Sequence, residues 1–221
     1  MERLVVALDV DGTLFDGIGV APEAIEALTR CRDRGDLLII VTGRRWETLA
    51  GVVPEVLPLC RMVVGEEGGV LVDLETDTVE LLAPALAPEL VAALRAAGVP
   101  DLDVGHVVVG GPVEYEHTFA EARDRLGSLQ HLVINKQSVA LAPPGCDKAS
   151  GLTAAIERLG AHDRPIFAIG DAANDLPMFA IATYPYAVAN ADSAVRESGV
   201  PFTEGSAGRG VAEALRLHLP T

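Results

Sequence analysis

With 221 residues, of which 49% are hydrophobic and 22% charged, the chain can bury the core of one large domain or of a domain with a smaller insert. The net charge of -15, with no basic cluster longer than Arg44–Arg45, argues against nucleic acid as a partner. Three scattered cysteines and the absence of any apolar run near the ~20 residues that span a bilayer predict a cytoplasmic protein with no membrane partner.

Short apolar runs alternate with helical segments along most of the chain. The expected strands are apolar at consecutive positions, as in a parallel sheet that is covered on both faces. They lie at residues 4–8, 37–41, 61–64, 166–169 and 186–188. The expected helices lie at residues 22–34, 45–52, 148–159, 175–181 and 210–218. This alternation predicts an α/β fold with a doubly wound, mostly parallel, Rossmann-like core sheet.

The middle of the chain departs from this pattern. It predicts helices at residues 88–97 and 114–126, and strands at residues 106–110, 132–134 and 138–141. Residues 135–137, "NKQ", are expected to form the turn of a hairpin between the last two strands. Proline-rich stretches, "APALAP" and "APPG", flank the segment. We therefore predict a small α+β domain at residues 78–144, inserted between core parts at residues 1–77 and 145–221.

Polar side chains follow three of the expected strands. The sequences at these points are "DVDGT" with Asp9 and Asp11, "TGR" with Thr42, and "GDAAND" with Asp171, Asn174 and Asp175. Ligands of open parallel α/β sheets bind at the carboxyl ends of the strands, so these side chains are expected to meet at one edge. The spacing of Asp9 and Asp11 directs both side chains to one face of an extended chain.

Four carboxylates at one edge need a cation. Hard oxygen ligands point to Mg²⁺, which takes few protein carboxylates and keeps several waters. Lys148 begins a helix directly after the insert and can supply a second positive charge there, although a cation is unfavourable at a helix N-terminus. Without such partners, Thr42 and Asp175 could each simply cap the helix that follows.

Taken together, the segments resemble the four ordered motifs of the haloacid dehalogenase (HAD) superfamily of phosphohydrolases. These are "DVDGTL", "VTGR", the lysine of "GCDKASGL" and "GDAANDLPMF". An insert between the second and third motifs resembles the cap of the Cof-like subgroup, and its size is similar to the caps of phosphoglycolate and sugar-phosphate phosphatases. In "VVGEEGGVLVD", Glu67 stands where this family commonly has asparagine, so no substrate contact is carried over to that position.

The resemblance implies a Mg²⁺-dependent phosphatase of small phosphorylated metabolites, monomeric or homodimeric. Asp9 would be the nucleophile that forms an aspartyl-phosphate, and Asp11 the general acid and base. The metal would be held by Asp9, the Asp11 backbone carbonyl and Asp171, with Asp175 close by. The residues expected to bind the phosphoryl group or the rest of the substrate are Thr42, Gly43, Arg44, Lys148 and Asn174.

Two other functions stay open at this point. A phosphomutase acting on sugar phosphates would share the aspartyl-phosphate, but it would need an activating bisphosphate and would not release phosphate. A phospho-accepting regulatory domain would use Asp9 only as an acceptor. Hydrolysis additionally needs the carboxylate of Asp11, which favours the phosphatase. No G-x-G-x-x-G follows a strand and no G-x-x-x-x-G-K-[ST] occurs, so the common dinucleotide and nucleotide-binding motifs are missing.

Overall fold

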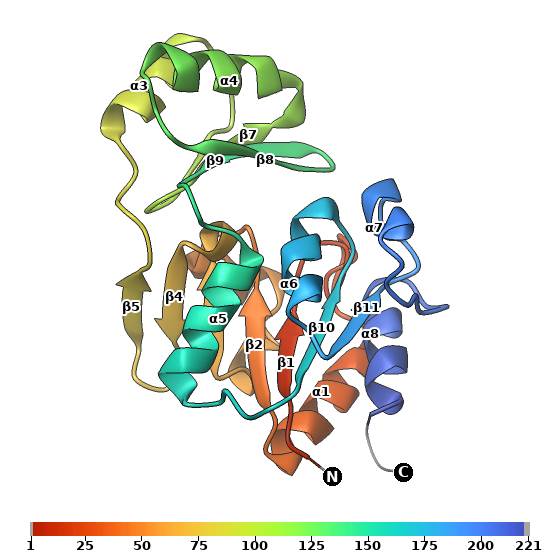
Figure 1. Ribbon diagram of the computed structural model, residues 1–221. Helices are drawn as coiled ribbons and strands as arrows, with labels where there is room; N and C mark the ends of the chain where they lie inside the picture. The colour runs from red at the N-terminus through yellow and green to blue at the C-terminus, as the bar shows by residue number, and fades with distance from the viewer. Residues whose placement is uncertain (1, 219–221) are drawn as a thin grey trace.

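The computed structural model describes residues 2–218 and confirms the α/β fold, with a seven-stranded sheet ordered β11-β10-β1-β2-β3-β4-β5 (Figure 1). The parallel strands are Tyr184–Ala187 (β11), Ile166–Gly170 (β10), Val5–Leu8 (β1), Leu37–Val41 (β2) and Met62–Gly65 (β3). Two antiparallel strands, Val70–Asp73 (β4) and Thr78–Leu81 (β5), extend one edge. No helix within the described residues is long and apolar enough to cross a membrane.

Both faces of this sheet are buried under helices. The helices of the two layers are α1 (Pro22–Arg34) with α8 (Ala207–Arg216), and α5 (Lys148–Leu159) with α6 (Leu176–Ala180). Successive residues of β1 alternate between the layers, with Val6 in the first and Ala7 in the second. This double burial explains the consecutive apolar residues, and it fixes the carboxyl end of β1 rigidly.

Strands β4 and β5 were not expected, and β5 corrects the domain boundary. The chain reverses after β3 because Glu66, Glu67 and Gly68 have positive φ angles of 51°, 55° and 93°. All four residues of β5 are exposed, so this edge strand lacks the run of consecutive apolar residues that marks the buried strands, yet it pairs with β4 in the large sheet. Residues 78–81 therefore belong to the core sheet, and the prediction that placed them in the insert is wrong.

Several other elements differ from their expected bounds. The helix expected at residues 45–52 is a 3₁₀ turn, Trp46–Thr48, followed by a short helix, Leu49–Val52 (α2). The helix expected at residues 175–181 is likewise a 3₁₀ turn, Ala173–Asp175, followed by α6. Strand β11 starts at Tyr184, before Pro185, which is tolerated because β11 is an edge strand. A short helix, Ser193–Glu197 (α7), was not expected, and residues 219–221 lie outside the described part.

The insert forms a small α+β unit that sits over the carboxyl ends of the core strands (Figure 1). Its antiparallel sheet has the order β6-β7-β9-β8, and two helices pack on the face that points away from the core. The elements are α3 (Pro88–Ala96), β6 (Asp103–Val104), β7 (Val109–Pro112), α4 (Glu116–Arg125), β8 (His131–Asn135) and β9 (Ser138–Ala142). The other face of the sheet looks toward the core, so we call this unit the cap.

A buried carboxylate from the core holds the cap in place. Glu66 is 1% exposed and accepts hydrogen bonds from the backbone N–H groups of His106 (3.0 Å), Val107 (2.8 Å) and Val108 (3.2 Å). The Nδ1 atom of His106 lies 2.9 Å from the same carboxylate. Residues 106–108, expected to start a strand, instead bind this carboxylate, and β7 begins at Val109.

Replacing Glu66 with alanine is expected to loosen the cap, because three backbone N–H groups, two of them buried, would lose their acceptor. We expect a loss of about 2–4 kcal/mol in the free energy of unfolding and fast hydrogen exchange at the amides of His106, Val107 and Val108. Glu89→Ala on exposed α3 is the matched control, with no such change expected. Unaltered protection of these three amides in Glu66→Ala would show that the carboxylate does not anchor the cap.

Candidate active site

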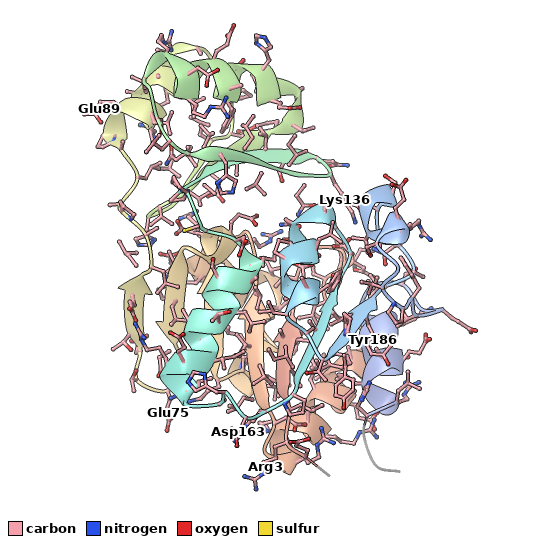
Figure 2. The ribbon with its side chains drawn as sticks, in the orientation of Figure 1. Arg3, Glu75, Glu89, Lys136, Asp163 and Tyr186 are labelled. Carbon is pink, nitrogen blue, oxygen red and sulfur yellow. The ribbon has the colours of Figure 1, made fainter. Side chains whose placement is uncertain are left out.

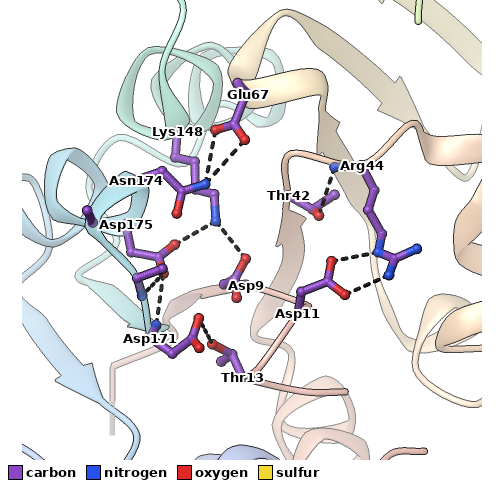
Figure 3. A network of polar contacts seen from close by, with 12 residues as sticks. Asp9, Asp11, Thr13, Thr42, Arg44, Glu67, Lys148, Asp171, Asn174 and Asp175 are labelled. Atoms are coloured by element: carbon purple, nitrogen blue, oxygen red, sulfur yellow. Dashed lines mark hydrogen bonds and ion pairs between the residues drawn. The ribbon is translucent and has the colours of Figure 1, made fainter. Parts of the chain in front are cut away.

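Three neighbouring strands deliver the expected polar residues to one edge of the core sheet (Figure 3). Asp9 follows β1, Thr42 follows β2 and Asp171 follows β10, and β1 lies between the other two. All three residues are at least 97% buried, at 3%, 1% and 1% exposure. The arrangement confirms that the carboxyl ends of these strands share one site, as expected for an open α/β sheet.

Asp9, Asp171 and Asp175 form a buried carboxylate trio. One oxygen from each lies within 4.8 Å of the others, and this is the one group of three or more potential metal ligands found among the described residues. Lys148 Nζ, on the first residue of α5, donates to Oδ1 of Asp9 and to Oδ1 of Asp175, each at 2.6 Å. Lys148 is itself 1% exposed, so one buried cation offsets part of the charge of three carboxylates.

The second oxygen of Asp175 shapes the turn that carries Asp171. It accepts hydrogen bonds from the backbone N–H groups of Asp171 (2.8 Å) and Ala172 (3.0 Å). Gly170 has no Cβ, and a Cβ there would overlap the Asp175 carboxylate. Asp175 therefore has two roles. One carboxylate oxygen caps the strand-to-helix turn, and the other binds Lys148.

Burial favours protonation of two acids of the trio, Asp9 and Asp171, when no metal is bound. Burial raises the pKa of Asp9 to about 8, helped by the charges of Asp175 and Asp171 and opposed by Lys148. Burial also raises the pKa of Asp171. Burial alone would lower the pKa of Lys148, but the carboxylates of Asp175, Asp9 and Glu67 raise it above its ordinary value, so Lys148 stays charged.

The trio fits a hard divalent cation. Oδ2 of Asp9 is buried and has no hydrogen-bond partner in the structure, which is costly for a carboxylate oxygen unless a ligand completes it. The other available atoms are carboxylate oxygens, the ligand type that Mg²⁺ prefers. The donor set and the oxygen without a partner therefore fit a metal ion.

Asp11 lies in the same cleft as Asp9 but points to a different cation. Its two carboxylate oxygens accept hydrogen bonds from Arg44, with Nε–Oδ2 at 2.6 Å and Nη2–Oδ1 at 2.7 Å. The Asp11 side chain is 40% exposed, whereas Asp9 is buried. Of the two residues, Asp9 thus belongs to the buried carboxylate trio and Asp11 faces the open cleft.

The loop after β2 packs tightly around Thr42 and Gly43. Thr42 Oγ1 accepts a hydrogen bond from the backbone N–H of Arg44 at 3.1 Å, so its hydroxyl stabilises the loop turn. A Cβ on Gly43 would overlap the carboxylate of Glu67, which explains glycine there. Thr42, Gly43 and Arg44 all line the cleft, as the sequence predicted for substrate-binding residues.

Asn174 binds Glu67 rather than Lys148. Its Nδ2 atom lies 3.2 Å from both Oε1 and Oε2 of Glu67, and its Oδ1 atom is buried with no partner. Glu67 is 6% exposed, and burial raises the pKa of its carboxyl group. The residue that departs from the common family asparagine therefore takes the amide of Asn174 for itself.

Sequence reasoning missed two side chains that contact Asp171. Thr13 Oγ1 donates to its Oδ1 at 3.4 Å. Lys136, on the turn between β8 and β9, forms an ion pair with its Oδ2 and brings the cap into the site. Thr13 belongs to the "DGT" motif, and the turn at Lys136 was predicted, but its position over the site depends on how the cap packs. A cleft of about 870 Å³ separates this hairpin and β7 from Asp9, Asp11 and Arg44.

The chain is similar to known proteins over nearly its whole length. A family model described as haloacid dehalogenase-like hydrolase matches residues 6–99 and 104–215. A phosphoglycolate phosphatase from Methanothermobacter thermautotrophicus is 30% identical over 220 residues, covering 96% of each chain. Among solved structures, a haloacid dehalogenase-like hydrolase from Bacteroides thetaiotaomicron has a TM-score of 0.82 at 20% identity, covering 99% of this chain and 100% of that one. A sugar phosphatase of HAD subclass IIB has a TM-score of 0.78 at 17% identity, with 98% and 99% covered.

The chain belongs to the haloacid dehalogenase-like hydrolase family. The expected resemblance to Cof-like members with an inserted cap is confirmed, as is the expected class of enzyme, a HAD-type phosphoric monoester hydrolase. Membership of an enzyme family leaves the alternative of a non-catalytic phospho-accepting domain without support.

Proposed function

We propose that this enzyme is a Mg²⁺-dependent phosphatase of small phosphorylated metabolites, with phosphoglycolate as the first substrate to test. The observation that carries the proposal is the buried trio of Asp9, Asp171 and Asp175 around Lys148, with one Asp9 oxygen left without a partner. The name of the relative from Methanothermobacter thermautotrophicus supports phosphoglycolate, and that of the subclass IIB structure keeps sugar phosphates in view.

In this proposal Asp9 is the nucleophile. Its carboxylate attacks phosphorus, the bond to the leaving alcohol breaks, and an aspartyl-phosphate forms. Asp11 gives a proton to the leaving oxygen and later takes one from the water that hydrolyses the intermediate. Because Arg44 occupies both oxygens of Asp11, their ion pair has to open when substrate arrives, which frees the Arg44 guanidinium for an anionic ligand.

The other site residues hold charge in place. Asp9, Asp171 and the backbone carbonyl of Asp11 would hold Mg²⁺, with Asp175 alongside. When bound, the ion supplies positive charge that offsets the negative charge of the phosphoryl oxygens. We assign Lys148, whose ammonium group binds Asp9 and Asp175, and Thr42 to the remaining phosphoryl oxygens.

A panel assay tests the proposal. Phosphate release would be measured from phosphoglycolate, hexose and pentose phosphates, glycerol phosphates and nucleotides, with Mg²⁺ or with EDTA. We expect Mg²⁺-dependent release from one group of these esters. If the folded, Mg²⁺-loaded protein released no phosphate from any of them but interconverted sugar phosphates once a sugar bisphosphate was added, the phosphomutase would replace the phosphatase.

The affinity for Mg²⁺ is expected to depend on pH. Burial and two neighbouring carboxylates raise the pKa of Asp9 to about 8, so Mg²⁺ displaces a proton at neutral pH. Its association constant should rise by up to about tenfold per pH unit between pH 6 and pH 8, and then level off. For the same reason, the metal-free protein binds more protons than the unfolded chain between the ordinary pKa of 3.8 and about 8. Its free energy of unfolding should therefore fall as the pH rises through that window.

Calorimetric titration of Mg²⁺ at several pH values, in two buffers of different ionisation enthalpy, measures both the affinity and the protons released. Asp9→Asn is the control, because it removes the titrating group. An association constant that does not change between pH 6 and pH 8 in the native enzyme would contradict the proposed burial effect on Asp9.

A further inference from the structure

The tip of the cap hairpin places a cation over the catalytic carboxylates. Lys136 occupies the turn between β8 and β9, where Figure 2 shows it at the end of the hairpin nearest the core. Its ammonium group forms an ion pair with Oδ2 of Asp171. The Lys136 side chain is 38% exposed, whereas that of Asp171 is 1% exposed, so the lysine reaches from the cleft onto a buried acid.

Lys136 differs from the other cations of the cleft in what it binds. The chain has only two lysines, Lys136 and Lys148, and both contact the carboxylate trio. Lys148 is buried on Asp9 and Asp175. The arginines of the cleft pair with acids outside the trio, Arg44 with Asp11 and Arg45 with Asp103 of the cap. Lys136 is thus a cation of the cap whose partner, Asp171, is itself a proposed metal ligand.

A metal on Asp171 changes the surroundings of Lys136. A carboxylate oxygen that binds Mg²⁺ no longer has its full charge for an ammonium group, and the two cations repel each other at close range. Glu66, a buried acid that also lines the cleft, already accepts hydrogen bonds from the backbone of residues 106–108. In the metal-loaded enzyme, Lys136 therefore faces the cleft and needs an anion that the substrate can bring.

We infer that Lys136 is the residue through which the cap recognises the carboxylate of an acidic leaving group. The inference rests on the proposed function and narrows it to monoesters of small hydroxy acids, of which phosphoglycolate is the simplest. In the metal-free enzyme the ammonium group binds Asp171; with metal and substrate present it binds the carboxylate of the ester. The short hairpin turn fixes the position of the Lys136 ammonium group relative to the phosphoryl site. The enzyme should therefore also select hydroxy acids by the distance between their phosphate and carboxylate groups.

The test compares two esters that differ in one group. Phosphoglycolate and 2-hydroxyethyl phosphate have the same size, but the second has a hydroxymethyl group in place of the carboxylate. For Lys136→Met we expect kcat/KM for phosphoglycolate to fall about a hundredfold, mainly through KM, because a charge-assisted hydrogen bond is lost. The value for 2-hydroxyethyl phosphate should change less than about threefold. Lys136→Arg should retain most of the preference, and Arg95→Met, which removes a charge from α3, should change neither value.

Binding to a variant that cannot turn over separates the two proposals. Calorimetry of phosphoglycolate binding to Asp9→Asn and to Asp9→Asn/Lys136→Met, both with Mg²⁺, should show a loss of about a hundredfold from the second substitution. If the native enzyme hydrolyses neither these two esters nor any other ester of the panel, the proposed function fails, while this titration still decides the role of Lys136. Equal losses of kcat/KM for the two esters in Lys136→Met, or an unchanged affinity for phosphoglycolate in the titration, would overturn the assignment of Lys136 to the carboxylate.

Discussion

Asp9→Asn is expected to lower the turnover of the preferred ester at least a thousandfold. The amide is a far weaker nucleophile than the carboxylate, and losing a covalent route costs several kcal/mol in the barrier, where each 1.4 kcal/mol is about tenfold. The fold should survive, because the Oδ1 atom of asparagine can still accept the hydrogen bond from Lys148 that Asp9 accepts at 2.6 Å. The measurement is the steady-state rate of phosphate release, with circular dichroism as the check on folding.

Asp16→Asn is the matched control for this substitution. Asp16 also lines the cleft, but its Oδ1 atom accepts hydrogen bonds from the backbone of Ile18 and Gly19, a role that asparagine preserves. We expect this variant to keep its activity within about threefold. A rate for Asp9→Asn above about one hundredth of the native rate would remove Asp9 from the role of nucleophile.

Lys148→Met is expected to destabilise the metal-free protein as well as abolish activity. Lys148 is 1% exposed and bonds two buried carboxylates, so its loss leaves Asp9 and Asp175 without their cation, and only Asp171 keeps one, Lys136. Breaking a buried ion pair costs about 3–5 kcal/mol, which corresponds to a fall in Tm of about 10 °C for a chain of this size. Thermal unfolding followed by circular dichroism in EDTA measures the effect.

Two conditions should reduce that loss. Mg²⁺ binds the same carboxylates and should restore part of the Tm of Lys148→Met. Lower pH should also narrow the gap between the variant and the native protein, because unpaired acids with raised pKa values take up protons. Arg158→Met is the control, since it breaks an exposed ion pair with Glu80 and should shift Tm by about 2 °C or less. A Lys148→Met variant as stable as the native protein in EDTA would show that the trio does not depend on this cation.

Sequence reasoning located the core of the site because local pattern and strand ends decide it. Buried parallel strands are apolar throughout, so the polar residue that ends each one, such as Asp9, Thr42 or Asp171, stands out and is placed by the sheet itself. Lys148 was placed for a related reason: it begins a helix, where a cation is unfavourable unless an acid meets it. The sequence alone therefore predicted that Asp9, Asp171 and Asp175 lie close together.

The remaining features depend on tertiary packing that no local pattern specifies. Strand β5 is exposed at all four positions, and its place is set by its pairing with β4. The backbone groups that bind Glu66 lie 40 to 42 residues away along the chain. Lys136 was placed in a turn correctly, but its contact with Asp171 depends on the orientation of the whole cap. The contacts of Glu66 and Lys136 join core to cap, and their geometry follows from how the two units pack rather than from local propensity.

The most direct test of the central claim is to detect the phosphorylated form of Asp9. Acetyl phosphate, whose leaving group needs no acid, would be mixed with Mg²⁺-loaded Asp11→Asn, a variant in which hydrolysis of the intermediate should be slow. The reaction would be quenched in acid and the peptides examined by mass spectrometry. We expect hydroxylamine-labile phosphate on the peptide that contains Asp9, and none in Asp9→Asn. Phosphate on another residue, or its steady release with the protein unlabelled at every time point, would contradict the account.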